Sequence, residues 1–451
     1  MPTIENGYNK YWDEERETMP REKRNEIILE RIKEQLHYVY NKLPFYRKLY
    51  DQHHFKPDDV RSLEDFTEKV PIVTKKMLVE DQKENPVFGS YAGDFTEDDI
   101  ARIQGSSGTS GTPTFYRVSK EDWDRAAEVH AMAQWATGVR PNDIVQIGFP
   151  FSLFFGGWGV IQGAERIGST IFPLGPMESV KQLELMDKVK STVFSATPSY
   201  CMHLINKAKE IGMNLEESSV KRLIVGGEAG GSLPNTKAAL TKGWNASVHD
   251  VASTSEMYPF QTNVECEAHE GVHVYTDEVF TEIVKKDDPN AKAEMGERGA
   301  IVYTHLWRKS QPMIRFWPGD ESYMVDEQCS CGRTYPLLPE GVLGRLDDMI
   351  VVRGANVYPS AVENIVRSFE WSGPEFQIIV EKKGALDEMT VVIEKKANGH
   401  DSERVKQMEQ EAAFMFKKQL GIRVETKVVD QGELPETVFK AKRVVDKRNN
   451  T

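Results

Sequence analysis

The sequence predicts an α/β protein with a large N-terminal domain, made of a parallel doubly wound sheet plus a β-rich annex, and a small α+β C-terminal domain. Three observations carry this prediction. From residue 143, short apolar runs alternate with segments of helical periodicity. Beyond residue 272, strand-like runs follow one another closely. The last hundred residues contain two adjacent strand-like runs, a charged helix and a final strand.

The sequence predicts a helical region followed by alternating strands and helices. In the first hundred residues, Ile28, Ile32, Leu36, Val39 and Tyr40 fall at helical spacing, which predicts a helical cap. The runs IVQIGF, STIFPL, STVFSAT, VKRLIVG and ASVHDV then alternate with helical segments, a pattern typical of a parallel sheet covered on both faces. Ligands of such sheets bind beyond the carboxyl ends of the strands. The clusters SATPS, GGEAGG and DVASTSE at three of these ends therefore predict a binding site.

The runs VHVYTDEVFTEIV, GAIVYTHL and MIRFW predict the β-rich annex. FQIIVEKK and EMTVVIEKK predict a hairpin, 402–419 a helix and VETKVVD a last strand. We place the domain boundary near Asp347, where the polar RLDD interrupts two apolar segments, and so predict domains at 1–346 and 347–451.

Composition excludes several classes of protein. The 451 residues carry a formal net charge of -13, and no basic stripe suited to a phosphate backbone is present, so we expect no nucleic-acid partner. No run of about 18 apolar residues and no basic leader is found, which predicts a cytoplasmic protein without a membrane partner. Four cysteines are too few and too unevenly placed for a disulfide framework, which leaves reduced thiols or a metal site. A small-molecule substrate fits this composition.

The segment GSSGTSGTPTFY, residues 105–116, is the densest cluster of small and hydroxylated residues. It lacks the G-K-[ST] ending of a nucleotide-binding P-loop. Its composition fits either a flexible linker or a loop whose hydroxyl and N–H groups hold phosphates. ARIQ before it and TFYRVS after it are strand-like, and Ser119 with Asp122 indicates a helix cap next in the chain. A linker rarely joins two elements of one unit, which favours the anion-binding loop.

These motifs, in this order from LPFYRKLY to FKAKRVVDKR, resemble those of the adenylate-forming enzymes, and within them the phenylacetate-CoA ligase-like branch. The resemblance implies an ATP-dependent acid–thiol ligase that adenylates an aryl or arylacetic carboxylic acid. The acyl group then passes to coenzyme A, with release of AMP and pyrophosphate. A homodimer is common among similar enzymes.

The resemblance also implies a role for each motif. SSGTSGTPT covers the β- and γ-phosphates, GGE frames the adenine, Asp250 lies at the adenine edge and Ser255 at the α-phosphate, and Glu256 is a catalytic residue that binds Mg²⁺. Asp320 holds the ribose and Arg345 lies near the ribose and phosphate, although an aspartate after Pro-Gly is also typical of a plain turn. The implied ATP- and AMP-binding residues are Ser106, Ser107, Gly108, Thr109, Gly111, Gly227, Glu228, Asp250, Ser253, Thr254, Ser255, Asp320 and Arg345.

LPETVFKAKRV resembles the motif that presents a catalytic lysine, here Lys440, and GRLDD resembles a hinge that pivots at Asp347. The small domain is then mobile: it withdraws Lys440 after adenylation and brings RGANVYP to the thioester-forming site. Lys440 and Mg²⁺ would neutralise the charge that builds when a carboxylate attacks an anionic phosphate. A solvated basic face is the alternative for this Lys- and Arg-rich tail.

The sequence departs from the family pattern at three positions. Ala252 replaces the tyrosine that usually stacks on adenine, and Tyr200 is a candidate substitute. Thr114 replaces a lysine, as is frequent in this branch, and Phe439 replaces a glycine. Two other functions stay open: an adenylating enzyme that passes acyl-AMP or AMP to an acceptor other than coenzyme A, and a nucleotide-binding protein without catalysis.

The stretch GFPFSLFFGGWG contains aromatic side chains that would wall a flat apolar pocket for the acid. An aromatic stripe of this kind is equally typical of a protein core. The predicted pocket comprises Phe149, Phe151, Phe154, Phe155 and Trp158, with Tyr200 added from the next part of the chain.

Cys329 and Cys331 form a C-x-C knuckle that suits two thiolates on one metal ion. Cys266 and His273 would complete a tetrahedral Cys₃His set for a structural Zn²⁺, as in several members of the branch, and His269 is a competing ligand. Reduced core cysteines are the alternative.

Overall fold

The computed structural model of the chain describes residues 4–5, 7–106, 113–352, 355–383, 386–396, 401–437 and 443–448. The chain forms two compact units. The first comprises Met1–Pro176, Ser191–Ser195 and His249–Val342, and the second comprises Met177–Lys190, Ala196–Val248 and Leu343–Thr451. No helix within the described ranges combines the length and apolar character that crossing a membrane requires.

Helices dominate the first hundred residues, as predicted. They are α1 (Glu14–Glu17), α2 (Arg21–Lys42), α3 (Pro44–Gln52), α4 (Leu63–Lys69) and α5 (Lys75–Glu84), with the 3₁₀ turns η1 (Pro57–Asp59) and η2 (Glu97–Asp99) and the short strands β1 (Ile4–Glu5) and β2 (Tyr8–Asn9). Ile28, Ile32, Leu36 and Val39 are buried on one face of α2 in a core shared with the annex strands, and Tyr40 packs partly buried against that core. The Thr74 hydroxyl caps α5 by accepting a hydrogen bond from the Met77 N–H.

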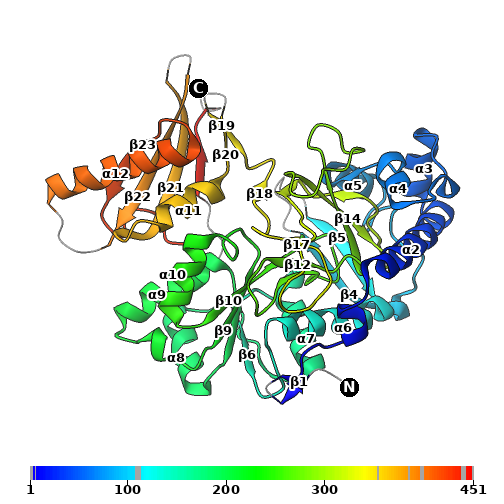
Figure 1. Cartoon of the computed structure of the whole chain (residues 1–451), viewed down its shortest axis with the longest axis horizontal. Helices are drawn as coiled ribbons and strands as arrows, with labels where there is room; N and C mark the ends of the chain where they lie inside the picture. The colour runs from blue at the N-terminus through cyan, green and yellow to red at the C-terminus, as the bar shows by residue number, and fades with distance from the viewer. Residues whose placement is uncertain are drawn as a thin grey trace. The chain divides into compact units, whose positions relative to one another are not determined.

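An eight-stranded sheet has the strand order β17-β12-β11-β10-β9-β8-β6-β7 (Figure 1). Its strands are β6 (Ile144–Ile147), β7 (Thr170–Phe172), β8 (Val193–Ala196), β9 (Arg222–Gly226), β10 (Ser247–Ala252), β11 (Asn263–Glu265), β12 (Val272–Val274) and β17 (Leu337–Leu338). β6 is parallel to β7 and to β8. The sequence did not predict the other edge of this sheet, where β11, β12 and β17 extend it beyond β10 by antiparallel pairing. The links 253–262 and 266–271 are shorter than the dozen or more residues that a parallel crossover needs.

The helices that alternate with these strands are α6 (Lys120–Ala136), α7 (Phe155–Ile167), α8 (Ser179–Val189), α9 (Pro198–Glu210) and α10 (Pro234–Trp244), with the 3₁₀ turn η3 (Leu215–Glu217). α6 begins where predicted, because the Ser119 hydroxyl accepts a hydrogen bond of 3.0 Å from the Asp122 N–H. α6 and α7 pack against one another.

The β-rich annex is also present. Its sheet contains β3 (Val73–Thr74), β13 (Val279–Val284), β14 (Gly299–His305), β15 (Phe316–Trp317), β16 (Asp320–Ser322) and β18 (Gly344–Arg345). Every residue of β14 is buried, which fits its central place in the sheet. β4 (Ile100–Ser106) and β5 (Thr114–Ser119) form a separate antiparallel hairpin, so the hydroxyl-rich segment joins two strands of one unit, as predicted.

The C-terminal part contains β19 (Ile350–Val352), β20 (Ala355–Val357), α11 (Pro359–Arg367), β21 (Ser372–Lys383), β22 (Leu386–Lys395), α12 (Ser402–Leu420), β23 (Glu425–Val429) and β24 (Val444–Asp446). The predicted hairpin is β21 and β22, in a four-stranded sheet of order β23-β22-β21-β24. α11 and α12 lie against this sheet and bury an apolar core of their own (Figure 1). The sequence did not predict β24.

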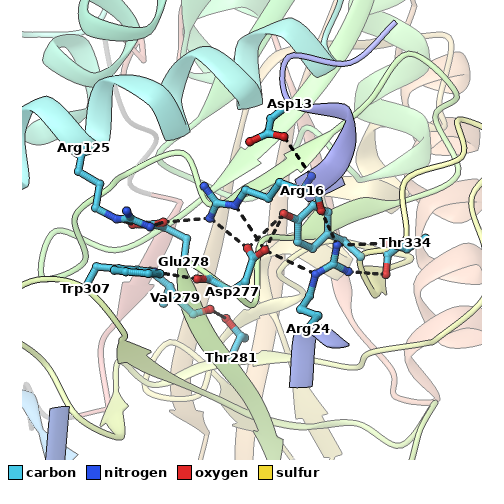
Figure 2. Close-up of polar contacts among 11 residues, drawn as sticks. Asp13, Arg16, Arg24, Arg125, Asp277, Glu278, Val279, Thr281, Trp307 and Thr334 are labelled. Atoms are coloured by element: carbon cyan, nitrogen blue, oxygen red, sulfur yellow. Dashed lines mark hydrogen bonds and ion pairs between the residues drawn. The ribbon is translucent and has the colours of Figure 1, made fainter. Parts of the chain in front are cut away.

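A buried ion network ties the N-terminal helices to the annex (Figure 2). Asp277 and Glu278 precede β13, and Arg16 of α1 reaches both carboxylates, at 3.1 and 3.0 Å. Arg125 of α6 lies 2.7 Å from Glu278. The Arg24 guanidinium lies 3.5 Å from Asp277 and stacks on the Tyr335 ring. Because the two carboxylates are buried and both are paired with arginines, α1, α2 and α6 are held in a fixed place within the first unit.

Candidate functional site

Glu256 lies just after β10, at the end of the DVASTSE segment, and its side chain is only 6% exposed. It forms an ion pair with Lys75, the first residue of α5. The Thr254 hydroxyl donates a hydrogen bond to the other carboxylate oxygen of Glu256. A carboxylate in so little water needs a compensating cation, and Lys75 supplies it.

Three hydroxyl groups close a ring with this ion pair. The Lys75 ammonium donates to Oγ of Ser106 at 3.0 Å, and Ser106 lies 2.7 Å from the hydroxyl of Thr114. Thr114 lies 2.8 Å from the hydroxyl of Tyr116, which donates to Oε1 of Glu256 at 3.4 Å. The donors satisfy every member when they run from Lys75 through Ser106, Thr114 and Tyr116 to Glu256. We call these five residues the Lys75–Glu256 ring.

The Tyr116 phenol of this ring is neutral. Burial raises the pKa of the Tyr116 phenol well above its usual range, and the negative charge of Glu256 raises it further. Tyr116 therefore stays protonated and donates to the carboxylate. Thr114 is almost completely buried within the ring. Thr114, for which the family resemblance implies a lysine in many relatives, thus holds a hydroxyl in this site, and the ammonium comes from Lys75 of α5.

The structure places the other predicted residues of the first unit as follows. Ser106 ends β4, and Ser253 and Ser255 flank Thr254 after β10. Asp250 lies within β10, where its N–H donates to the Glu265 carboxylate at 3.2 Å. Asp320 begins β16, after Gly319 with a φ of +93°. The predicted residues Ser107, Gly108, Thr109, Gly111 and Lys440 lie outside the described residues.

Two groups of predicted residues belong to the second unit. Gly227 follows β9 with a φ of +85°, a conformation that favours glycine, and the next residue, Glu228, accepts a hydrogen bond of 2.8 Å from the Ser199 N–H in the first turn of α9. Arg345 and Asp347 form a bidentate pair of 2.8 and 2.7 Å on an exposed surface. The predicted nucleotide contact and the predicted pivot therefore bind one another here.

The RFWPGD motif also has a structural member that the sequence did not predict. Arg315 is completely buried and pairs with Glu282 of β13 at 3.3 Å. Its Nη1 donates to the carbonyl oxygens of Thr67 and Val70, both at 2.7 Å. This arginine joins α4 to the annex, so part of the motif serves the fold.

The aromatic segment divides into core and surface residues. Phe155 is buried, in a cluster with Val118, Ala126 and Tyr258, so it is a core residue. Phe149 is buried as well. Phe151 and Trp158 are partly exposed and meet edge to face with ring centroids 5.5 Å apart. In the second unit, Tyr200 is buried and stacks on His203 with centroids 5.9 Å apart.

The structure brings the four predicted metal ligands together. The thiol and imidazole donor atoms of Cys266, His273, Cys329 and Cys331 all lie within 4.8 Å of one another. The Sγ atoms of Cys266 and Cys329 are 3.8 Å apart, and Sγ of Cys331 is 3.3 Å from Nε2 of His273. Two thiolates on one tetrahedral Zn²⁺, each about 2.3 Å from it, are about 3.8 Å apart. The donor set and its spacing therefore fit zinc.

Electrostatics distinguish the two thiols of the knuckle: hydrogen bonds with Cys266 and Cys329 lower the pKa of Cys331, whereas those with Cys266 and Cys331 raise the pKa of Cys329. Burial alone would lower the pKa of His273, but its hydrogen bonds with Cys266 and Cys331 raise that pKa to about 9. The competing ligand His269 lies outside the cluster, with its Nδ1 3.5 Å from Glu265 and its ring against His249. Of the two candidate histidines, His273 is the one that faces the cysteines.

Sequence reasoning missed Lys75, Tyr116 and the buried Arg315. Lys75 is one of two adjacent lysines at a helix start, Lys75 and Lys76, and no spacing distinguishes them. Only packing turns the first toward Glu256, whereas the side chain of Lys76 is 84% exposed.

Comparison with known proteins gives consistent matches. Residues 354–448 match the family described as AMP-binding enzyme C-terminal domain. The phenylacetate-coenzyme A ligase of Thermus thermophilus is 34% identical over 84% of this chain and 83% of its own length, and that of Escherichia coli is 30% identical over 93% and 94%. A crystal structure of 2-hydroxyisobutyryl-CoA ligase in complex with 2-HIB-AMP, in the postadenylation state, aligns with a TM-score of 0.94 at 35% identity, over 99% of this chain and 94% of that one. The overall fold agrees with the mixed α/β architecture of these ligases, with a large N-terminal and a small C-terminal domain.

Proposed function

The chain belongs to the phenylacetate-CoA ligase-like branch of the adenylate-forming enzymes and is an AMP-forming CoA ligase, and we propose that its acid substrate is an aryl or arylacetic acid. The observation that carries the proposal is the pair Phe151 and Trp158, two partly exposed rings in edge contact within a Gly- and Phe-rich segment. Arg102 lies over the Trp158 ring, 4.5 Å from its centroid, and partly exposed rings of this kind pack against aromatic ligands in offset or edge-to-face contact.

The adenylation roles are proposals as well. Glu256 is proposed to bind Mg²⁺, since a buried carboxylate oxygen is a ligand that this hard cation prefers. The metal supplies charge neutralisation at the phosphates when bound. Lys440 is proposed to provide a second positive charge from the C-terminal domain, and Asp347 to act as the pivot between two poses of that domain.

Pyrophosphate release measured over a panel of acids tests the substrate class. With ATP, Mg²⁺ and coenzyme A, we expect kcat/KM for phenylacetate or benzoate to exceed that for 2-hydroxyisobutyrate by about tenfold or more, because burial of a ring contributes more apolar area than two methyl groups. Dependence of turnover on coenzyme A checks the acceptor. A preference for 2-hydroxyisobutyrate would contradict the aromatic assignment.

A small 2-hydroxy acid is the second candidate substrate. The similarity to 2-hydroxyisobutyryl-CoA ligase in sequence identity and in fold favours it. The same panel of acids separates the two candidates, because the true substrate is expected to saturate the enzyme at concentrations where the other acid does not.

We also propose a structural Zn²⁺ on Cys266, His273, Cys329 and Cys331. The tetrahedral spacing of the donor atoms supports it. The ion would hold the β12 strand to the 329–331 knuckle and take no part in the reaction. A homodimer and a cytoplasmic location stay predictions, to be checked by light scattering and by cell fractionation.

A further inference from the structure

The Lys75–Glu256 ring contains one positively charged residue, Lys75, which is not among the nucleotide-binding residues that the sequence predicted. Lys75 is bound to Glu256 and Ser106, and its side chain is still 34% exposed. Tyr116 and Thr114 are buried, so Lys75 is the one member of the ring with substantial access to solvent. A ligand that approaches Glu256 from solvent meets this ammonium.

We infer that Lys75 binds the triphosphate of ATP and supplies the positive charge that the hydroxyl-rich segment lacks. The inference rests on the proposed function, because it takes Glu256 as the Mg²⁺ ligand. A carboxylate that binds a divalent cation no longer needs the ammonium as its counter-ion, and the two cations repel one another at close range. Lys75 then requires another anion, and the phosphate oxygens are the acceptors at hand.

The position of Lys75 supports a contact with the β- or γ-phosphate. It donates to Ser106, the last residue of β4, and the hydroxyl-rich segment begins at that residue. A lysine has three donors on a flexible four-carbon chain, so it exchanges one acceptor for another at small cost in backbone rearrangement. The Thr114 hydroxyl, which is buried next to Ser106, keeps its position when Lys75 changes its acceptor.

The neighbouring residue provides a matched control. Lys76 has the same charge, lies on the same turn of α5 and is 84% exposed, 3.9 Å from Glu80. Replacement of Lys76 removes one positive charge from the same helix without touching the Lys75–Glu256 ring. Any effect of overall charge on nucleotide binding therefore appears in both variants.

The test is calorimetric binding of ATP and of AMP, each with Mg²⁺, to the full-length protein without acid or coenzyme A. For Lys75→Gln we expect ATP affinity to fall about 10- to 100-fold, the range of a lost hydrogen bond to a charged group, and AMP affinity to change less than about twofold. Lys76→Gln should bind both nucleotides as the wild type does. Lys75→Arg, which keeps the charge, should recover most of the ATP affinity.

Unchanged ATP affinity in Lys75→Gln overturns the inference, and so does an equal loss for ATP and AMP, which would show that Lys75 only neutralises Glu256. Circular dichroism and the thermal midpoint of each variant identify a folding defect. If Lys75→Gln has one, the ratio of ATP affinity to AMP affinity in Lys75→Arg is used as the test instead. Acid-dependent pyrophosphate release by the wild type is measured in parallel. If the wild type shows no acid-dependent pyrophosphate release, the proposed function is wrong. If the ratio of ATP to AMP affinity is unchanged in Lys75→Gln, only the proposed role of Lys75 is wrong.

Discussion

Glu375 and Thr437 are joined by two hydrogen bonds: the Thr437 N–H donates to Oε1 at 3.0 Å and its hydroxyl donates to Oε2 at 2.7 Å. The same carboxylate forms a buried ion pair with Arg443. Thr437 and Arg443 lie on the two sides of residues 438–442, which contain Lys440. A single carboxylate on β21 therefore anchors both ends of the segment to which we assign the catalytic lysine.

Glu375→Gln is expected to destabilise the C-terminal domain by about 3 kcal/mol, because Arg443 is left buried without its counter-charge. Burial opposes ionisation of Glu375, but Arg443 and the hydrogen bonds from Thr437 outweigh it and lower the pKa. This stabilisation is present above the usual carboxyl range and is lost as pH falls through the lowered pKa. Urea unfolding at pH 7 measures the change, with Glu403→Gln in the first turn of α12 as a control expected to cost below about 1 kcal/mol.

Equal stability of Glu375→Gln and the wild type would show that Arg443 finds another partner. The conservative variant Glu375→Asp tests whether a shorter side chain still contacts both partners. It should keep either the ion pair with Arg443 or the two Thr437 hydrogen bonds, so its stability should fall between those of the wild type and Glu375→Gln.

Cys331→Ser is expected to remove zinc from the Cys₃His cluster. Three ligands bind a structural Zn²⁺ far less tightly than four, since the hydroxyl that replaces the thiolate is a poor ligand. Elemental analysis of protein purified without chelators should give about one zinc per chain for the wild type and a small fraction of that for the variant. Absence of zinc from the wild-type protein would leave reduced thiols as the correct interpretation.

His269→Asn is the control for that experiment. His269 has a φ of +57°, which asparagine tolerates, and it lies outside the cluster. Zinc content should stay at the wild-type level. A loss of zinc in this variant would instead identify His269 as a ligand.

Buried His130 should make the protein less stable in mild acid. Its Nε2 accepts a hydrogen bond from the Phe260 N–H, and burial lowers its pKa to about 3. Below pH 6.5 the His130 imidazole is protonated in the unfolded chain, whereas in the folded chain it stays neutral down to about pH 3. Stability is therefore fully present above pH 6.5 and falls by about 1.4 kcal/mol per pH unit below it. Urea titrations from pH 7 to pH 5 measure this slope, which His130→Gln should reduce by one proton. The exposed His53→Gln should leave the slope unchanged, and an unchanged slope in His130→Gln would exclude His130 as its source.

Lys440→Ala is expected to lower adenylation by about 10²-fold, because one preorganised positive charge is lost from the transition state. Thioester formation from preformed acyl-adenylate should be spared. Single-turnover measurement of each half-reaction separates the two effects, with Lys447→Ala as a control in the same tail. Equal losses in both half-reactions would argue for a role in folding or in binding.

Local patterns predicted most of the elements. The helical spacing of Ile28, Ile32, Leu36 and Val39 and the period-2 hairpin of β21 and β22 both follow from backbone geometry, which is the same wherever the segment lies. The antiparallel edge of the large sheet was missed because strand direction depends on the length of the connections and on partners distant in sequence. β24 is three residues long, too short for any periodicity to reveal.

The sequence by itself determined the family, the order of its motifs and the four residues of the Cys₃His cluster, because each of these depends on residue type and spacing along the chain. Only the tertiary structure decided that Lys75, 181 residues from Glu256 in the chain, is its counter-ion. Two identical neighbours, Lys75 and Lys76, differ only in the face of α5 that each occupies. Packing placed one of them beside a buried carboxylate and left the other in water, and the cost of burying an unpaired charge makes that difference large.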